Sequence, residues 1–107
     1  MKTVLVVIDD KEISNLIRDL LTGLNMQVKI EWSFFPAKQK MYDFDYDILI
    51  IDEDVLDQGK PLAIQQLRNT SRAEIYVLVD SIPSNRSNNI KYIVKPEVSH
   101  QLKLFFA

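Results

Sequence analysis

The segment Asp47-Ile48-Leu49-Ile50-Ile51-Asp52 decides the fold, because it sets an uninterrupted apolar run between two aspartates. Such a run indicates a strand that is buried on both faces, as the central strands of parallel sheets are. The run stops at an acidic cluster, Asp52-Glu53-Asp54. The segment therefore predicts a central strand that delivers carboxylates to one edge of a sheet.

Four further segments have the pattern of strands. Three are apolar runs of the buried type, and the fourth alternates apolar and polar residues, which indicates a strand nearer the sheet edge. The three runs cover 4–8, 75–79 and 90–94, and the alternating segment covers 26–32. Segments with helical spacing separate the strands, so the chain predicts an α/β fold with helices on both faces of a parallel sheet.

Composition limits the classes of function. The 107 residues suit a single domain over 1–107, and 13 Lys plus Arg against 15 Asp plus Glu argue mildly against nucleic-acid binding. There is no Cys and only one His, His100, which excludes disulfides, thiol chemistry and multi-histidine metal sites. The apolar runs are too short for a membrane span or a secretory signal, so we expect a cytoplasmic domain.

The chain has only two glycines, Gly23 and Gly59, fewer than a multi-element α/β domain normally uses at turns. Gly23 lies near the end of the first helical segment and suits a C-terminal cap. Gly59-Lys60-Pro61 interrupts the pattern, and Pro61 suits the start of a helix. We therefore expect Gly23 to cap the first helix and another helix to begin at Pro61.

Charged residues gather where the predicted strands end, and in parallel sheets this edge is the one that binds ligands. Taken singly, each Asp is better explained as a turn or helix-cap residue, but the combination favours a site. Converging carboxylates without His or Cys suit a hard cation, Mg²⁺ above all, and a lysine supplies a point charge for phosphoryl oxygens. The strand ends carry Asp9-Asp10, Asp52-Glu53-Asp54, Asp80-Ser81 and Lys95-Pro96. They predict a phosphoryl-transfer site.

In this combination the sequence resembles the receiver domain of two-component response regulators, the CheY-like superfamily, along nearly the whole chain. The segments that carry the resemblance are 4–10, 47–52, 75–79 and 92–96. The resemblance implies a flavodoxin-like, doubly wound sheet of five parallel strands in the order 2-1-3-4-5. The spacing of the acidic and lysine motifs fits the family except in the last interval.

The resemblance also implies roles for the acidic residues. Asp52 resembles the aspartate that takes a phosphoryl group from a sensor histidine kinase. Asp9 and Asp10 resemble the metal-binding pair of the family. Together with Asp52 and the backbone carbonyl of Asp54, they would bind Mg²⁺.

Two residues of the last strand region match the family as well. Lys95 resembles the lysine that contacts the phosphoryl oxygens, and in the family the bond to the following proline, here Pro96, is usually cis. Tyr92 resembles the aromatic switch residue that reorients on activation.

The sequence departs from receivers at the end of the fourth strand, where they carry Thr or Ser. Val79 or Asp80 corresponds to that position, depending on register, and neither supplies a neutral hydroxyl. Asp80 would repel an incoming phosphoryl group. Ser81 is the candidate stand-in, with an ordinary loop serine as the alternative.

The connection over residues 80–89 is the second departure. A crossover with its helix needs at least roughly 10–12 residues, and this segment contains a single apolar side chain, Ile82. We therefore predict that the fourth helix of the family is missing or one turn long. That helix contributes to the usual output or dimer surface, so the surface would be altered.

The leading hypothesis is a receiver domain phosphorylated on Asp52, a signalling domain rather than an enzyme, with at most self-phosphorylation and autodephosphorylation. Its expected partners are a sensor histidine kinase and either a C-terminal output domain or a separate protein, and a homodimer stays open. Direct nucleic-acid or membrane binding is not expected. The alternative is a pseudo-receiver, a phosphorylation-independent interaction module. A flavodoxin-like enzyme is disfavoured because no Gly-rich loop follows the first strand, and an aspartate-based phosphatase because little chain is left for a substrate cap.

Overall fold

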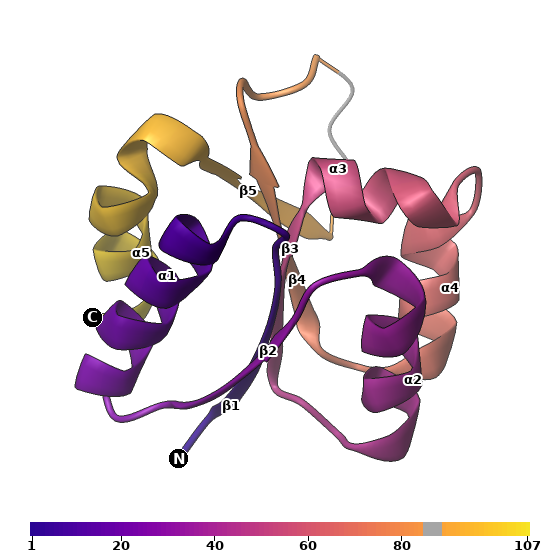
Figure 1. The fold of residues 1–107 in the computed structure, drawn as a ribbon, viewed down its shortest axis with the longest axis horizontal. Coiled ribbons are helices and arrows are strands. Elements are labelled where there is room, and N and C mark those ends of the chain that lie inside the picture. Colours follow the sequence, from indigo (N-terminus) through magenta and orange to yellow (C-terminus); the bar gives the residue numbers. More distant parts are fainter. Residues whose placement is uncertain (85–88) are drawn as a thin grey trace.

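A five-stranded parallel sheet forms the centre of the computed structural model, which describes residues 1–84 and 89–107 (Figure 1). The strand order is β2-β1-β3-β4-β5, so the predicted α/β architecture and order 2-1-3-4-5 are confirmed. The strands are β1 (Thr3–Val7), β2 (Gln27–Glu31), β3 (Ile48–Asp52), β4 (Glu74–Val79) and β5 (Ile90–Val94).

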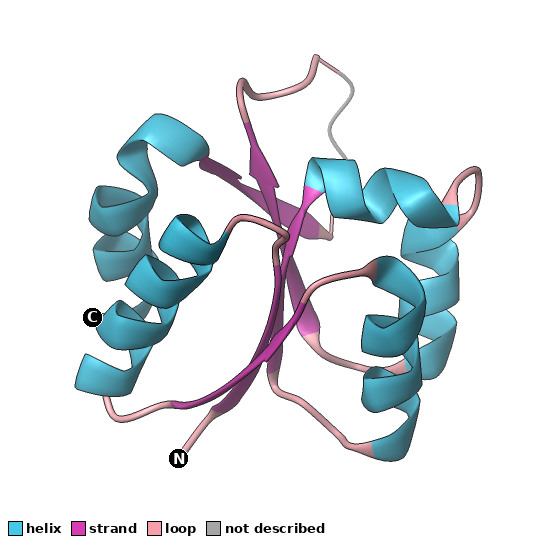
Figure 2. Ribbon diagram, viewed as in Figure 1, coloured by secondary structure: helices cyan, strands magenta, loops and turns pink. Residues whose placement is uncertain are grey.

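Helices cover both faces of this sheet (Figure 2). Helices α1 and α5 lie side by side on one face, whereas α2 and α4 lie on the other, with the short α3 above them. In the part of the chain that is described, no helix is long and apolar enough to cross a membrane. The helices are α1 (Lys11–Gly23), α2 (Phe34–Asp43), α3 (Glu53–Leu56), α4 (Ala63–Thr70) and α5 (Val98–Phe106), and 3₁₀ turns cover Asp57–Gly59 and Lys95–Glu97.

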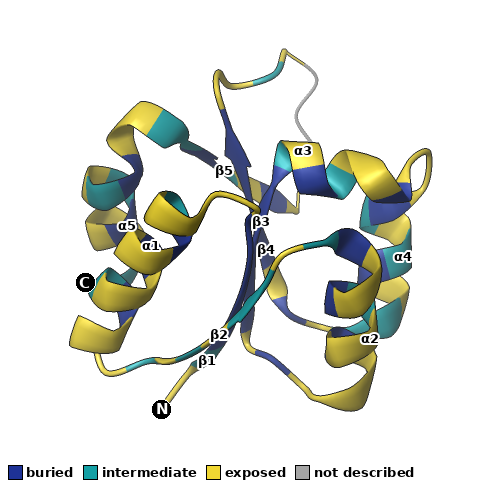
Figure 3. Ribbon diagram, viewed as in Figure 1, coloured by how far each residue is buried: buried dark blue, intermediate teal, exposed yellow. Residues whose placement is uncertain are grey.

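Strand β3 is buried along its whole length (Figure 3). Its side chains alternate between two cores: Leu49 and Ile51 pack on the α2 and α4 side, and Ile48 and Ile50 pack on the α1 and α5 side. Burial of each such aliphatic side chain contributes about 1.5–3 kcal/mol. Because β1 pairs with β3 up to Val7 opposite Ile51, both strands end together at the same edge of the sheet.

The two outer strands are less buried than the central ones. In β2 the apolar side chains are half-buried and the intervening ones are mostly exposed, as predicted for an edge strand. Strand β5 has the sequence of a buried strand but lies at the other edge, where Lys91 is exposed and Ile93 is fully buried. An edge strand needs an apolar face on one side only, so its apolar run overstates its burial.

The connection between β4 and β5 has no helix in residues 80–84 and 89. The predicted loss or shortening of a helix here falls partly on residues 85–88, which lie outside the described residues. Both α3 and α4 precede β4, so they belong to the crossover from β3. A groove of about 640 Å³ runs beside α4, is lined by Leu62, Ile64 and Arg68 among others, and reaches Asn89.

Two expectations about turn residues need correction. Gly23 is the last residue of α1 rather than its cap, because the C-cap is Leu24, and the left-handed backbone falls on Asn25, with φ of 65°. Asn tolerates this conformation better than most residues, so glycine is not required. The helix expected to begin at Pro61 begins two residues later, at Ala63.

The two glycines give a matched pair of stability tests. A Cβ at Gly59 would overlap the fully buried ring of Phe34, whereas a Cβ at Gly23 would meet nothing within 4 Å. We expect Gly59→Ala to lower the free energy of unfolding by about 1–3 kcal/mol through overpacking. Gly23→Ala, in a helix, should leave it unchanged or raise it by up to about 1 kcal/mol. Urea denaturation measures both, and equal stability of the two variants would contradict the packing at Gly59.

Candidate functional site

Asp52, the last residue of β3, is a buried carboxylate at the carboxyl edge of the sheet, with 2% of the residue exposed. One oxygen, Oδ1, accepts a hydrogen bond from the backbone N–H of Asp54 at 2.9 Å, which caps α3. The other oxygen, Oδ2, lies 3.1 Å from Nζ of Lys95. A buried charge is stable only when paired and hydrogen-bonded, and both conditions are met here. The carboxylate is therefore held in one orientation.

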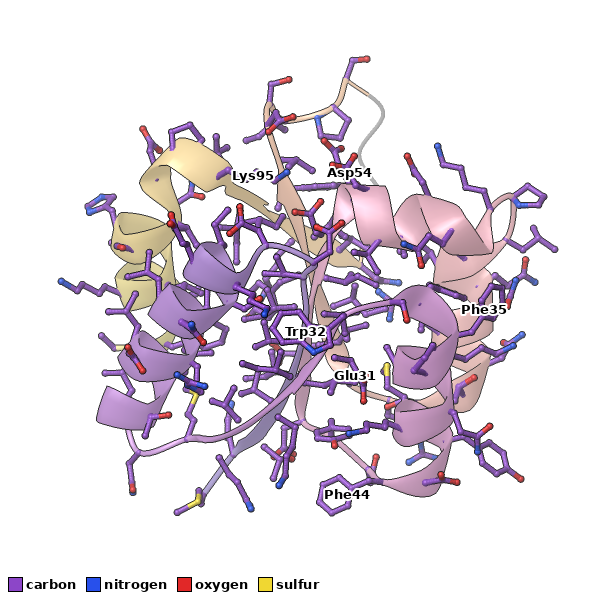
Figure 4. All side chains as sticks on the ribbon, viewed as in Figure 1. Glu31, Trp32, Phe35, Phe44, Asp54 and Lys95 are labelled. Atoms are coloured by element: carbon purple, nitrogen blue, oxygen red, sulfur yellow. The ribbon has the colours of Figure 1, made fainter. Side chains whose placement is uncertain are left out.

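Lys95 stands among three carboxylates. Its Nζ lies 3.1 Å from Asp52, 3.6 Å from Asp80 and 3.9 Å from Asp54, and its side chain is 21% exposed. Figure 4 shows the side chain reaching from the end of β5 toward Asp54 at the start of α3. Burial disfavours the charged ammonium, but the hydrogen bond to Asp52 and the three negative charges outweigh burial and raise the pKa of Lys95 above its ordinary value. The side chain is therefore a permanent cation at neutral pH.

Contacts of Val94, the residue before Lys95, fix the position of the Lys95 backbone. Val94, the last residue of β5, pairs with Val79 of β4 and donates its N–H to Oε1 of Gln101 on α5 at 2.6 Å. The residues that follow these two strand ends, Lys95 and Asp80, are thereby brought together. Sequence reasoning missed Gln101, because a polar residue on an amphipathic helix carries no signal of its own.

Asp9 and Asp10 follow β1 and lie at the same edge as Asp52, because β1 and β3 are neighbours. Both are exposed. Asp10 is the N-cap of α1, and its Oδ1 accepts hydrogen bonds from the N–H groups of Glu12 at 2.9 Å and Ile13 at 3.2 Å. The helix-cap interpretation of Asp10 is therefore correct in the structure. It uses one oxygen and leaves Oδ2 outside the cap.

The structure does not by itself show a metal site. Among the described residues, no three His, Asp or Glu side chains lie together in a way that could hold a metal ion. The metal roles of Asp9, Asp10, Asp52 and the Asp54 carbonyl therefore stay predictions. The donor chemistry nevertheless fits Mg²⁺, which keeps several waters and commonly takes only one or two carboxylates from the protein.

The register at the end of β4 decides which residue stands beside Lys95. Val79 is buried and ends the strand, and the exposed Asp80 follows it and contacts the lysine. The backbone N–H of Asp80 donates to Oε1 of Glu53 at 3.5 Å. Ser81 is exposed and lies one residue further along the loop. Its proposed part as a hydroxyl stand-in stays a prediction, whereas Asp80 stands at the lysine.

Two expectations concern the last strand region. Tyr92 is half-buried and packs against the core on the α2 and α4 side of the sheet, which is compatible with a switch residue but does not test that role. The expected cis bond between Lys95 and Pro96 is wrong. The cis bond lies at Lys60–Pro61 instead, and Pro96 lies within a 3₁₀ turn.

No family model and no curated protein sequence matches this chain. Solved structures do match. A response regulator receiver domain protein from Bacillus halodurans has a TM-score of 0.76 at 21% identity, over 98% of this chain and 93% of that one. A CheY-like receiver domain from Methylobacillus flagellatus has a TM-score of 0.79 at 18% identity, over 98% and 96%.

Two further matches come with bound groups or partners. The receiver domain of a sensor histidine kinase from Pseudomonas aeruginosa was solved with a magnesium ion in its active site cleft, and matches at a TM-score of 0.79 and 18% identity, over 98% and 93%. A response regulator protein in complex with a histidine kinase matches at a TM-score of 0.73 and 21% identity, over 100% of both chains. The chain thus has the fold of response regulator receiver domains along nearly its whole length.

Proposed function

We propose that this chain is a response regulator receiver domain that accepts a phosphoryl group on Asp52. The observation that carries the proposal is the buried Asp52 carboxylate, held beside Lys95 at the carboxyl edge of the sheet. A carboxylate that is fixed in orientation and paired with a lysine has the arrangement expected of a phosphoacceptor.

The donor would be a phosphohistidine of a sensor histidine kinase. An oxygen of Asp52 attacks phosphorus, the P–N bond to the imidazole breaks, a P–O bond to the carboxylate forms, and the released imidazole takes up a proton. The Asp54 N–H holds Oδ1, and the Lys95 ammonium stands at Oδ2, where it can neutralise phosphoryl oxygens. The match to a regulator in complex with a histidine kinase supports this class of donor.

The metal would be Mg²⁺. Asp9, Asp10, Asp52 and the carbonyl of Asp54 would hold it, and the magnesium ion in the matched receiver domain supports this assignment. When bound, Mg²⁺ neutralises charge on the phosphoryl oxygens. The N-cap hydrogen bonds of Asp10 already hold one of its oxygens, so its side chain is oriented before any cation arrives.

The domain would act as a cytoplasmic signalling module. Tyr92, on the same strand as Lys95, would be the switch aromatic, and the signal would pass to an output domain or a partner protein. The chemistry would be limited to self-phosphorylation and autodephosphorylation.

A second candidate function, a phosphorylation-independent pseudo-receiver, is favoured by one observation. Lys95 already has carboxylate partners from three segments of the chain, and one of them, Asp80, comes from the end of β4, where neither Val79 nor Asp80 offers a neutral hydroxyl. A site whose lysine is already paired can hold one conformation without phosphate. Labelling of Asp52 distinguishes the two candidates.

The first prediction of the proposal concerns labelling. With Mg²⁺ and acetyl phosphate, a small phosphodonor, we expect the protein to gain one phosphoryl group and Asp52→Asn to gain none, because only the carboxylate can accept it. Asp45→Asn serves as a matched control, since Asp45 is exposed and precedes β3 at the amino ends of the strands, away from Asp52. Intact-mass spectrometry measures the gain. Absence of labelling in the unchanged protein, or equal labelling of Asp52→Asn, would favour the pseudo-receiver.

The second prediction concerns the ion pair. Lys95→Met leaves the buried Asp52 carboxylate without its cation, and an unsatisfied buried group costs about 1–3 kcal/mol of unfolding free energy. In the double variant with Asp52→Asn the uncompensated charge is gone, so the loss should be smaller than that of Lys95→Met alone. Urea denaturation gives the free energy of unfolding of the unchanged protein, the two single variants and the double variant, which together form a double-mutant cycle. Strictly additive losses would show that the two side chains do not interact in solution.

The third prediction concerns pH. The pKa of Lys95 is raised in the folded protein, so its contribution to stability is complete below its ordinary pKa of 10.5 and is lost as the pH rises through the folded value. We expect the stability difference between the unchanged protein and Lys95→Met to be constant from neutral pH to about pH 10 and to shrink above it. A difference that shrinks between pH 6 and pH 9 would assign the effect to another group.

A further inference from the structure

We propose that Asp80 sets how tightly this site binds anions. Its carboxylate is a built-in partner of Lys95 and opposes the binding of a further anion, such as a phosphoryl group, at Asp52. The inference rests on the proposed function, because the anion it concerns is the phosphoryl group. The role of Asp80 would depend on its negative charge, beside any part it has in the loop after β4.

The ends of β4 and β5 place Asp80 beside Lys95. Asp80 and Lys95 follow Val79 and Val94, which are paired in the β4–β5 register, so the sheet itself sets the two side chains together. The carboxylate oxygen Oδ1 of Asp80 lies 3.6 Å from Nζ of Lys95. The same ammonium contacts Asp52 at 3.1 Å. Asp80 is therefore linked to the phosphoacceptor through one shared cation.

A carboxylate at this position acts differently from a hydroxyl. An ionised carboxylate only accepts hydrogen bonds, whereas a hydroxyl can also donate one to a phosphoryl oxygen. A carboxylate next to Lys95 thus gives an anion on Asp52 no donor and adds a like charge nearby. It also holds part of the positive charge that the anion would need.

Negative charges outnumber positive ones around Lys95. Lys95 supplies one positive charge, and the three carboxylates around it supply three negative ones. The outer carboxylates of Asp54 and Asp80 are 73% and 79% exposed, so water screens them, and each pair with Lys95 is weak on its own. The repulsion they exert is accordingly moderate. Asp80 should therefore lower the affinity for an anion without abolishing it.

The experiment measures binding of beryllofluoride, an acyl-phosphate mimic, with Mg²⁺ present. We expect Asp80→Asn and Asp80→Thr to bind it about two- to fivefold more tightly, the range expected when one exposed, water-screened like charge is removed. Asp80→Glu, which keeps the charge, and Asp45→Asn, which makes the same change in net charge at the opposite edge of the sheet, should bind like the unchanged protein. Fluorine NMR and titration calorimetry report the bound fraction, and circular dichroism confirms that each variant is folded.

Every outcome bears on the inference. Tighter binding by Asp80→Asn and Asp80→Thr alone, including binding where the unchanged protein shows none, supports it. Equal binding by the unchanged protein and these variants overturns it and leaves the proposed function standing. An equal gain in Asp45→Asn also overturns it, because net charge would then be the cause. If no protein binds beryllofluoride, both the inference and the proposed function fail.

Discussion

Burial of β3 on both faces is the constraint from which the rest of the structure follows. Because Leu49 and Ile51 face one core while Ile48 and Ile50 face the other, both faces of the sheet must be covered by helices. A strand buried in this way can only be central, with neighbours on both sides. Its last residue, Asp52, is consequently carried to the edge where parallel strands end.

The position of Asp52 creates an electrostatic demand that other strands meet. The Asp52 side chain is 3% exposed and needs a partner, and the cation, Lys95, directly follows β5, with β4 lying between β5 and β3. Only a long side chain can cross that interval, which explains a lysine rather than a shorter donor. The same crossing takes Lys95 past the end of β4, so the residue there, Asp80, contacts it as well.

Much of the fold and part of the site could be predicted from the sequence. The periods of the apolar residues revealed all five strands, and the acidic strand ends revealed Asp52 and Lys95 as neighbours, because both signals are local. The misses have nonlocal causes. Asp80 was expected at a strand end, but its contact with Lys95 depends on the β4–β5 register. The bond between Val94 and Gln101 depends on how α5 docks, and the left-handed residue is Asn25 rather than the nearby glycine.

The two departures from the receiver pattern meet in one connection. Asp80 begins the segment between β4 and β5, and the described part of that segment has no helix. The receiver pattern has its fourth-strand hydroxyl and the helix after it here, so both differences from the pattern lie in one stretch of the chain. Strand β5 lies beside this stretch: Lys95, the partner of Asp52, follows its end, and Tyr92 lies half-buried within it. Among the strands whose ends carry the site residues, β1, β3, β4 and β5, only β5 has a neighbour on one side alone, so strand pairing constrains it least.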